Sequence, residues 1–565
     1  MTNFLIQVAI DIHQANTTVV PVVAQAGTAL FPLIMLGIMS VFGLLLRPRE
    51  LLRVIRSKPW IPFLVVAIAT GGWFAFDWIF FHPATTNTGA SRRSGDAHEI
   101  VSGARTDWAA VALRIIAQEA PGAERSPAPL LPSATVQQPA KYTGALMFRG
   151  TATRSGYLGG PLPTGLTPAW TFYAQDEHDA MALSSPVVHA GKIFGTSCYL
   201  SPPSSYGTIF CLDAASGSQL WLSEAKDVAR KSPFKGFFSS PAITADGRYL
   251  VIGQGLHQDF NSDLVCLDAS NGAVHWVAPT SLHIESSPAI EGDVVVVGVG
   301  AVEQGKDHRP QGAVDGPGNP GFVLGVRISD GVELFRTPVD DPEGSPVLLD
   351  GICYIGSGVN GNAVVALRTG TDAELLTAHL SREVWRTPTP FSASGAVSVV
   401  GDLVIIGIGK GDFVTSAAEP EGRVLALDRT TGAILWQASV ADAVLGPIGI
   451  HGNVAVAPVR NGEVVALSIK DQGHILWRAA VHGSAPVLAG PVVTDAFVYA
   501  VSNDGYLGVF DVRDGKQLER IYINANGKPG EMGLSTSSPV VIDGHLYVGS
   551  ETGGLRCFNG TRTTP

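Results

Sequence analysis

Five ionisable side chains lie in the short loops that lead into a repeated Ser-Pro motif. They are Lys235, His283, Glu285, Glu343 and Glu531. If these loops surround one opening, their mixed charges could hold a divalent ion or an anionic cofactor there. Polar residues also line such openings in proteins that bind nothing at them, so the five are candidates for cofactor binding only. The sequence assigns no catalytic residue and no metal ligand.

Other chemical motifs are missing from the sequence. There is no Ser-His-Asp order, no zinc-protease motif and no phosphate-binding P-loop. The glycine-rich stretch 407–411 leaves a strand-like run but enters no helix, so it lacks the helix N-terminus that binds phosphate. The net charge of −11 argues against a nucleic-acid partner.

Two repeated motifs must position the candidate side chains. The first is Ser-Pro, degraded to Gly in some copies, followed by apolar residues, at intervals of roughly 44 to 58 residues. Its eight copies begin at Ser185, Ser240, Ser287, Ser345, Gly395, Gly446, Gly490 and Ser538. The second is a hairpin with a turn at Gly432 and a second strand ending in Trp436, where glycine supplies the positive φ of a short turn. This period predicts an all-β, eight-bladed β-propeller.

The order of the two motifs also predicts how the ring closes. Trp170 lies on a strand that precedes the first Ser-Pro motif, whereas the last repeat ends at Phe558 without a Trp strand of its own. Pairing the first Trp strand with the last blade would remove both open edges.

The repeats resemble the PQQ-like (quinoprotein-type) β-propeller family over roughly residues 146–558. The family signature Ala-x-Asp-x-x-Thr-Gly-x-x-x-Trp is matched in full at residues 426–436, and Phe148-Arg149-Gly150 resembles the stretch with which members often open. The resemblance implies the fold and two kinds of function, a non-enzymatic scaffold of the cell envelope or a PQQ-dependent dehydrogenase. Dehydrogenases of the family use an adjacent cysteine pair, a calcium ion held by Glu, Asn and Asp, and a catalytic Asp. The five cysteines here are never adjacent, and no calcium triplet can be placed.

The cysteines and one insertion leave alternatives open. Cys211, Cys266 and Cys557 occupy equivalent strand positions, as small buried hydrophobes would. Cys198 and Cys211 are expected on neighbouring strands, either as separate buried thiols or as a disulfide. The insertion 303–321 is either a contact loop or a surface excursion.

The segment before the propeller predicts attachment to a membrane. Residues 29–46 and 60–81 are each apolar and long enough to cross a bilayer as a helix. The basic loop between them predicts a two-span anchor (1–81) in the bacterial cytoplasmic membrane, with the N-terminus and the propeller outside. Residues 82–145 read as a Pro/Ala/Ser-rich linker with one short helix, 146–560 as the propeller and 561–565 as a tail.

The sequence therefore predicts a membrane-anchored propeller that acts as a non-enzymatic scaffold for envelope proteins. No cofactor is expected under this hypothesis. One alternative is a membrane-bound quinoprotein dehydrogenase of alcohols or sugars, which would bind PQQ and calcium. A further alternative is a sensor that binds a small ligand at the channel mouth.

Overall fold

The computed structural model describes residues 146–564, except 175–179, 202–203, 227–231, 257–258, 260–261, 281, 301–320, 360, 412, 414–415, 526–529 and 531–532. A boundary at Pro127/Ala128 separates two units, and the second contains every described residue. The expected spans 29–46 and 60–81, the linker, and the insertion 303–321 except its last residue, Gly321, lie outside the described residues. No helix within the described part is both long and apolar enough to cross a membrane.

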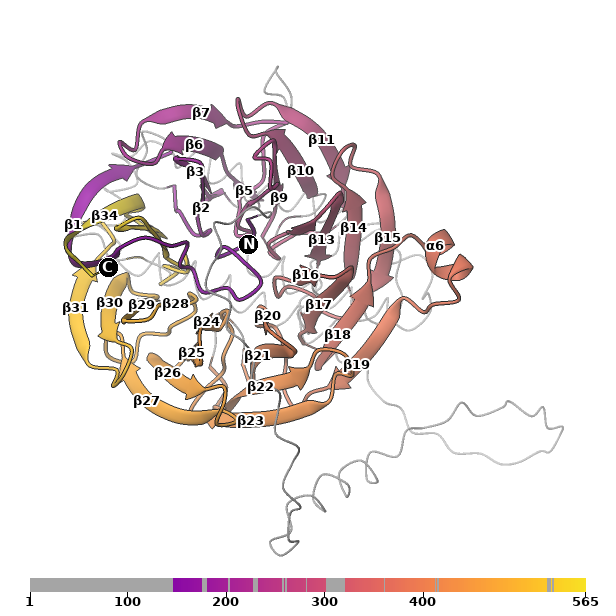
Figure 1. The fold of residues 1–565 in the computed structure, drawn as a ribbon. Coiled ribbons are helices and arrows are strands. Elements are labelled where there is room, and N and C mark those ends of the chain that lie inside the picture. The colour runs from indigo at the N-terminus through magenta and orange to yellow at the C-terminus, as the bar shows by residue number, and fades with distance from the viewer. Residues whose placement is uncertain are drawn as a thin grey trace, which may run out of the picture. The chain divides into compact units, whose positions relative to one another are not determined.

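The described residues form a ring of eight antiparallel four-stranded sheets, which confirms the predicted eight-bladed propeller (Figure 1). Blades 1 to 4 are built as follows. Blade 1 is β2 (Val187–His189), β3 (Lys192–Thr196), β6 (Ile209–Asp213) and β7 (Gln219–Ser223), with an inserted hairpin of β4 (Tyr199–Ser201) and β5 (Ser204–Tyr206). Blade 2 is β8 (Ala242–Ile243), β9 (Tyr249–Gly253), β10 (Asp263–Asp268) and β11 (Val274–Pro279). Blade 3 is β12 (Ala289–Glu291), β13 (Val294–Val299), β14 (Phe322–Arg327) and β15 (Glu333–Pro338). Blade 4 is β16 (Val347–Leu349), β17 (Ile352–Ser357), β18 (Ala363–Arg368) and β19 (Glu383–Pro388), with the helix α6 (Asp372–Thr377) between its last two strands.

Blades 5 to 8 continue the same order. Blade 5 is β20 (Ser398–Val400), β21 (Leu403–Gly409), β22 (Gly422–Asp428) and β23 (Ile434–Val440). Blade 6 is β24 (Gly449–His451), β25 (Val454–Pro458), β26 (Glu463–Ser468) and β27 (His474–Ala480). Blade 7 is β28 (Val492–Val493), β29 (Phe497–Ser502), β30 (Tyr506–Asp511) and β31 (Gln517–Tyr522). Blade 8 is β32 (Val540–Ile542), β33 (His545–Ser550), β34 (Gly554–Thr564) and, as its outer strand, β1 (Leu162–Phe172).

Blade 8 closes the ring with strands from both ends of the propeller. β1 pairs antiparallel with β34, and Trp170 lies opposite Cys557. This pairing confirms the predicted closure. The pairing continues to Leu162 and Thr564, so β34 extends into the segment expected as a tail.

The tryptophan of one blade packs on the turn glycine of the next, which explains the repeated signature. Asp428 Oδ1 accepts hydrogen bonds from the backbone N–H groups of Thr430 (3.0 Å) and Thr431 (2.8 Å), and Gly432 has a φ of 72°. A Cβ added at Gly432 would lie 2.6 Å from the ring of Trp385 in blade 4. The same contact, at 2.5–2.7 Å, recurs in the pairs Trp170–Gly217, Trp221–Gly272, Trp276–Gly331, Trp436–Gly473 and Trp477–Gly515. Glycine is therefore required at this position for two reasons: it adopts the positive φ, and it leaves space for the indole ring.

Blade 4 departs from this pattern because α6 replaces its tight turn. The guanidinium carbon of Arg382 lies 4.3 Å from the ring centroid of Phe335, the aromatic residue of blade 3. This arginine covers the ring where other blades place a turn glycine. Helix α6 projects from the outer rim of the ring (Figure 1).

All five cysteines are buried and free, so Cys198 and Cys211 are separate thiols. Cys211 lies opposite Trp221, and Cys266 lies opposite Trp276, in equivalent registers of blades 1 and 2. Burial raises the pKa of Cys211 to about 11, which keeps this thiol protonated and unreactive at neutral pH. The cysteines pack as small hydrophobic residues, as the sequence predicts.

Candidate functional site at the channel mouth

The inner strands are joined near the channel axis by hydrogen bonds between the serines of the Ser-Pro motif. The backbone N–H of Ser185 donates to Oγ of Ser240 (2.9 Å), and Ser240 donates to Ser287 in the same way (2.9 Å). Equivalent bonds run from Ser287 to Ser345, from Gly490 to Ser538 and from Ser538 to Ser185. The series breaks between blades 4 and 7, because glycine replaces the serine at residues 395, 446 and 490. There the backbones approach directly, and a Cβ on Gly446 would overlap the carbonyl oxygen of Leu488.

Residues 146–160 cross one end of the channel and are called the plug here (Figure 1). Backbone hydrogen bonds tie the plug to inner strands on several sides of the ring. Leu146 exchanges two with Ile243 of blade 2, and the N–H of Val399 in blade 5 donates to the carbonyl of Ala152 (2.8 Å). On the far side, Val541 of blade 8 donates to Gly156 (2.9 Å). The plug therefore acts as a cross-brace between blades that do not touch one another.

Two buried arginines fasten the plug where the serine series is broken. Arg154 donates to the carbonyl oxygens of Val397 (2.6 Å), Pro346 (2.6 Å) and Phe148 (2.9 Å), while Arg149 donates to Pro491. Burial and the neighbouring Arg154 charge lower the pKa of Arg149, and burial lowers the pKa of Arg154 to about 9. Arg154 therefore stays charged at neutral pH, and its planar fork binds carbonyls of blades 4 and 5 together.

Above the plug lies a blind pocket at the start of the inner strands. It contains about 590 Å³ of empty space, counting the part that is open to solvent. Phe148 of the plug lines it, together with serines of the Ser-Pro motif. Most of the remaining lining is apolar: Leu183, Phe238, Ala396, Phe413, Leu445, Pro447 and Leu488. Phe148 places one residue of the plug in the wall of this pocket.

The structure brings two of the five candidate side chains to this pocket and places a third beside one of them. Glu285 and Glu343 line it, and Nε2 of His283 lies 3.4 Å from Oε1 of Glu343. Lys235 is not among the lining residues, and Glu531 lies outside the described residues. A role for any of them in cofactor binding stays a prediction.

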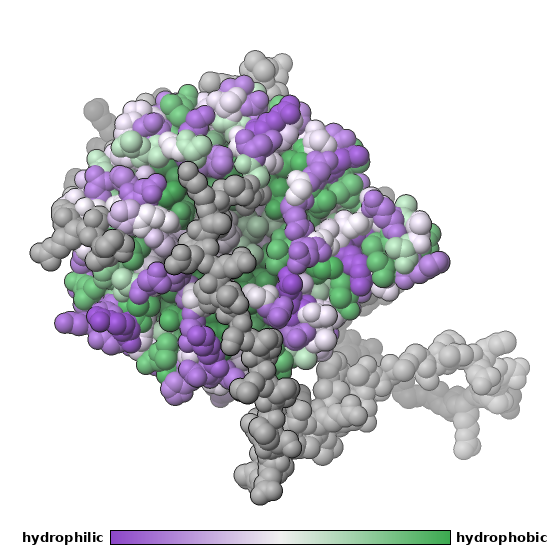
Figure 2. Space-filling view, viewed as in Figure 1, coloured by the Kyte–Doolittle hydropathy of each residue, from purple (hydrophilic) through white to green (hydrophobic). Residues whose placement is uncertain are grey.

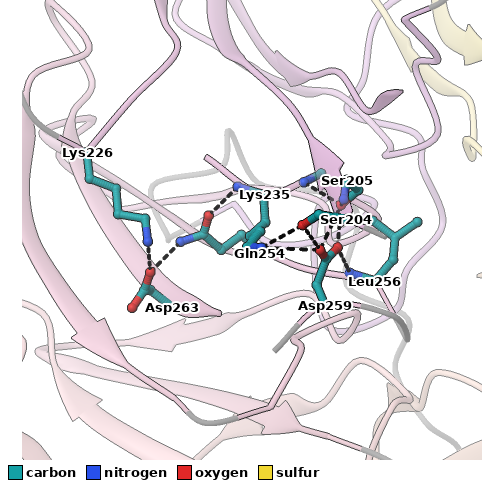
Figure 3. A network of polar contacts seen from close by, with 9 residues as sticks. Ser204, Ser205, Lys226, Lys235, Gln254, Leu256, Asp259 and Asp263 are labelled. Atoms are coloured by element: carbon teal, nitrogen blue, oxygen red, sulfur yellow. Dashed lines mark hydrogen bonds and ion pairs between the residues drawn. The ribbon is translucent and has the colours of Figure 1, made fainter. Parts of the chain in front are cut away.

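Lys235 instead belongs to a network between blades 1 and 2 (Figure 3). Its Nζ lies 2.6 Å from Oγ of Ser204 and 3.5 Å from Oδ1 of the buried Asp259. Burial acts to raise the pKa of Asp259, but hydrogen bonds from Ser205, Ser204 and the N–H of Leu256 outweigh it and hold the pKa below its ordinary value. The network fastens the β4–β5 hairpin to the neighbouring blade.

Two aromatic residues of the pocket were not predicted from the sequence. The rings of Phe238 and Phe413 meet edge-to-face with centroids 6.4 Å apart. Phe238 lies two residues before a Ser-Pro motif, so the repeat could have indicated it. Phe413 lies in the loop between β21 and β22, where no repeat position marks it.

The described residues do not fit PQQ and calcium. PQQ is a tricarboxylate, and no lysine or arginine is among the described residues that line the pocket. Calcium binds through several oxygen ligands, and no group of three or more His, Cys, Asp or Glu side chains within the described part could hold a metal ion.

On the face that Figure 2 shows, hydropathy does not single out a docking patch. Hydrophilic and hydrophobic residues are interspersed over the face that Figure 2 shows. The pocket at the channel mouth is therefore the best-defined candidate site.

Comparison with known proteins identifies the repeat. The family profile described as outer membrane protein assembly factor BamB matches residues 205–308 and 420–563. BamB of Yersinia pestis is 22% identical over 62% of this chain and 80% of its own, and BamB of Xanthomonas campestris pv. campestris is 24% identical over 58% and 80%. The quinohemoprotein alcohol dehydrogenase of Comamonas testosteroni superposes with a TM-score of 0.52 at 14% identity, over 75% of this chain and 82% of that enzyme, and this likeness concerns the fold alone. The chain carries PQQ-like propeller repeats, as the sequence predicts.

The same comparisons correct the predicted localisation. The relatives are named as assembly factors of outer membrane proteins, so the two-span placement in the cytoplasmic membrane is wrong. The prediction depended on the apolar length of two segments and the basic charge between them. Neither property reports which membrane of the envelope a protein serves.

Proposed function

We propose that this protein is a non-enzymatic scaffold that binds envelope proteins during outer membrane protein assembly. The observation that carries the proposal is the match of two separate propeller segments to the assembly-factor family. The ring and its plug agree with a binding role, because described residues that lead into the inner strands of all eight blades line one pocket. The pocket, without cationic lining residues in the described part, does not favour the dehydrogenase alternative.

Deletion of the gene in its own host tests the proposed function. We expect lower amounts of outer membrane β-barrel proteins, measured by their heat-modifiable migration in gels, and restoration by the full chain. Unchanged barrel amounts in the deletion strain would contradict the proposal. Dye reduction by the purified chain with PQQ, calcium and an alcohol would support the dehydrogenase instead.

We also propose that the apolar segments 29–46 and 60–81 attach the propeller to a membrane through the linker 82–145. Their hydropathy supports this arrangement. The full chain should sediment with membranes after alkaline carbonate washing, and a chain without residues 1–81 should stay in the supernatant. Equal sedimentation of both chains would show that attachment lies elsewhere.

A further inference from the structure

The walls of the blind pocket come from two apolar clusters outside the blade cores. One consists of Met181, Leu183 and Cys198 with the partly buried Phe238, Leu256 and Leu534. The other consists of Ala443, Leu445 and Leu488 with the partly buried Phe413. The clusters belong to opposite sides of the ring and meet where Phe238 contacts Phe413. Two aromatic rings are therefore available to an apolar group that enters the mouth.

The two described lining residues with a charged side chain are both acidic. Glu285 and Glu343 come from the loops that enter blades 3 and 4, whereas Phe413, Leu445 and Leu488 come from blades 5 to 7. No lysine or arginine is among the described lining residues. A group that complements this surface carries an apolar or aromatic body and a positive charge beside it.

We infer that the pocket is an anchor site for an extended segment of a partner protein. One large apolar or aromatic side chain of the segment packs against the touching rings of Phe238 and Phe413, and an adjacent lysine or arginine pairs with Glu285 and Glu343. The inference rests on the proposed scaffold function and names the surface that it uses. The plug supports this inference, because a floor formed by Phe148 gives an anchor side chain a closed end to fill rather than an open channel.

Blocked synthetic pentapeptides test the anchor site on the purified full chain by isothermal titration calorimetry. Gly-Lys-Phe-Lys-Gly should bind the parent, and Gly-Glu-Phe-Glu-Gly and Gly-Lys-Ala-Lys-Gly should each bind at least about tenfold more weakly. Phe413→Ala should weaken the first peptide by a similar factor, with exposed Leu518→Ala on the outer rim as its control.

The charge contribution has its own matched pair of variants. The double variant Glu285→Gln/Glu343→Gln should weaken the basic peptide about tenfold and reduce the dependence of its binding on salt. Glu333→Gln/Glu383→Gln changes the net charge equally on the exposed outer strands β15 and β19 and should bind like the parent.

Equal binding of the basic and acidic peptides, or unchanged binding by the pocket variants, would overturn the anchor site. Neither result bears on the scaffold function, which is measured separately through barrel-protein amounts in the deletion strain. Restoration of those amounts by the parent but not by Phe413→Ala would support the anchor site. Full restoration by Phe413→Ala and by the double carboxylate variant would overturn it while leaving the scaffold function in place.

Discussion

The contact between a tryptophan and the turn glycine of the next blade can be measured with two matched glycine substitutions. Gly272 has a φ of +74°, and a Cβ added there would lie 2.5 Å from Cε3 of Trp221. Gly191 has the same φ of +74°, but nothing lies within 4 Å of its added Cβ. Substitution by alanine imposes the same backbone strain at both positions and an overlap at only one.

The expected losses in the free energy of unfolding follow from the backbone strain and from the overlap with the indole ring. Alanine in the left-handed region costs roughly 1–2 kcal/mol of the free energy of unfolding, so Gly191→Ala should lose about that amount. Overpacking of a filled site adds about 1–3 kcal/mol, so Gly272→Ala should lose about 2–5 kcal/mol in total. Trp221→Ala should lose about 3–5 kcal/mol, because the side chain is buried at 8% exposure.

Urea unfolding of the parent, Gly272→Ala, Trp221→Ala and the double variant measures the coupling between the two positions as a double-mutant cycle. In the Trp221→Ala background the overlap is gone, so Gly272→Ala should cost only its strain. The interaction free energy between the two positions should therefore be about 1–3 kcal/mol, with the double variant more stable than additivity predicts. Equal losses at Gly191 and Gly272, or additivity in the cycle, would refute the interblade contact as the reason for the conserved spacing of the repeat.

Three further perturbations address the plug, the network and the closure. Arg154→Ala leaves buried carbonyl oxygens unpaired and should lower the free energy of unfolding by about 3 kcal/mol, whereas exposed Arg327→Ala should change it by less than about 0.5 kcal/mol in the same urea titration. The pKa of Asp259 is lower in the folded chain than in the unfolded chain, so the stabilisation by its carboxylate is complete above about pH 4 and is lost as the pH falls further. Asp259→Asn should therefore be about 2 kcal/mol less stable than the parent at pH 7 and should lose less stability on acidification. Parallel curves of stability against pH for the two chains would contradict this prediction. A chain without residues 1–173 lacks β1 and should self-associate in sedimentation velocity, because β34 is left with an open edge. If this shortened chain stays monomeric and its melting temperature is unchanged, the ring closes elsewhere.

The ring itself was predictable because its determinants repeat. Asp428, Gly432 and Trp436 recur with a spacing that is typical of a hairpin, and one unpaired Trp strand at the start indicated where the ring closes. The free cysteines were likewise indicated by their equivalent positions. Each of these features depends on backbone register, which a periodic sequence reports.

The site was predictable only in part because side-chain direction in loops is not periodic. Glu285 and Lys235 both lie close before a Ser-Pro motif, yet Glu285 lines the pocket while Lys235 lies beside Asp259 in another blade. Phe413 reaches the mouth from within blade 5, so its place depends on a loop conformation that the repeat does not specify. The localisation failed for a different reason, since hydropathy measures affinity for a bilayer and not the identity of that bilayer.

The pairing of β1 with β34 also sets the order of events during synthesis. Leu162 pairs with Thr564, so the whole of β34 must leave the ribosome before the ring can close. Until then the nascent chain carries the unpaired edge of β1 through the synthesis of seven blades, and such an edge recruits other strands. A stop codon within β34 (Gly554–Thr564) would therefore leave the edge of β1 unpaired and produce a chain that aggregates.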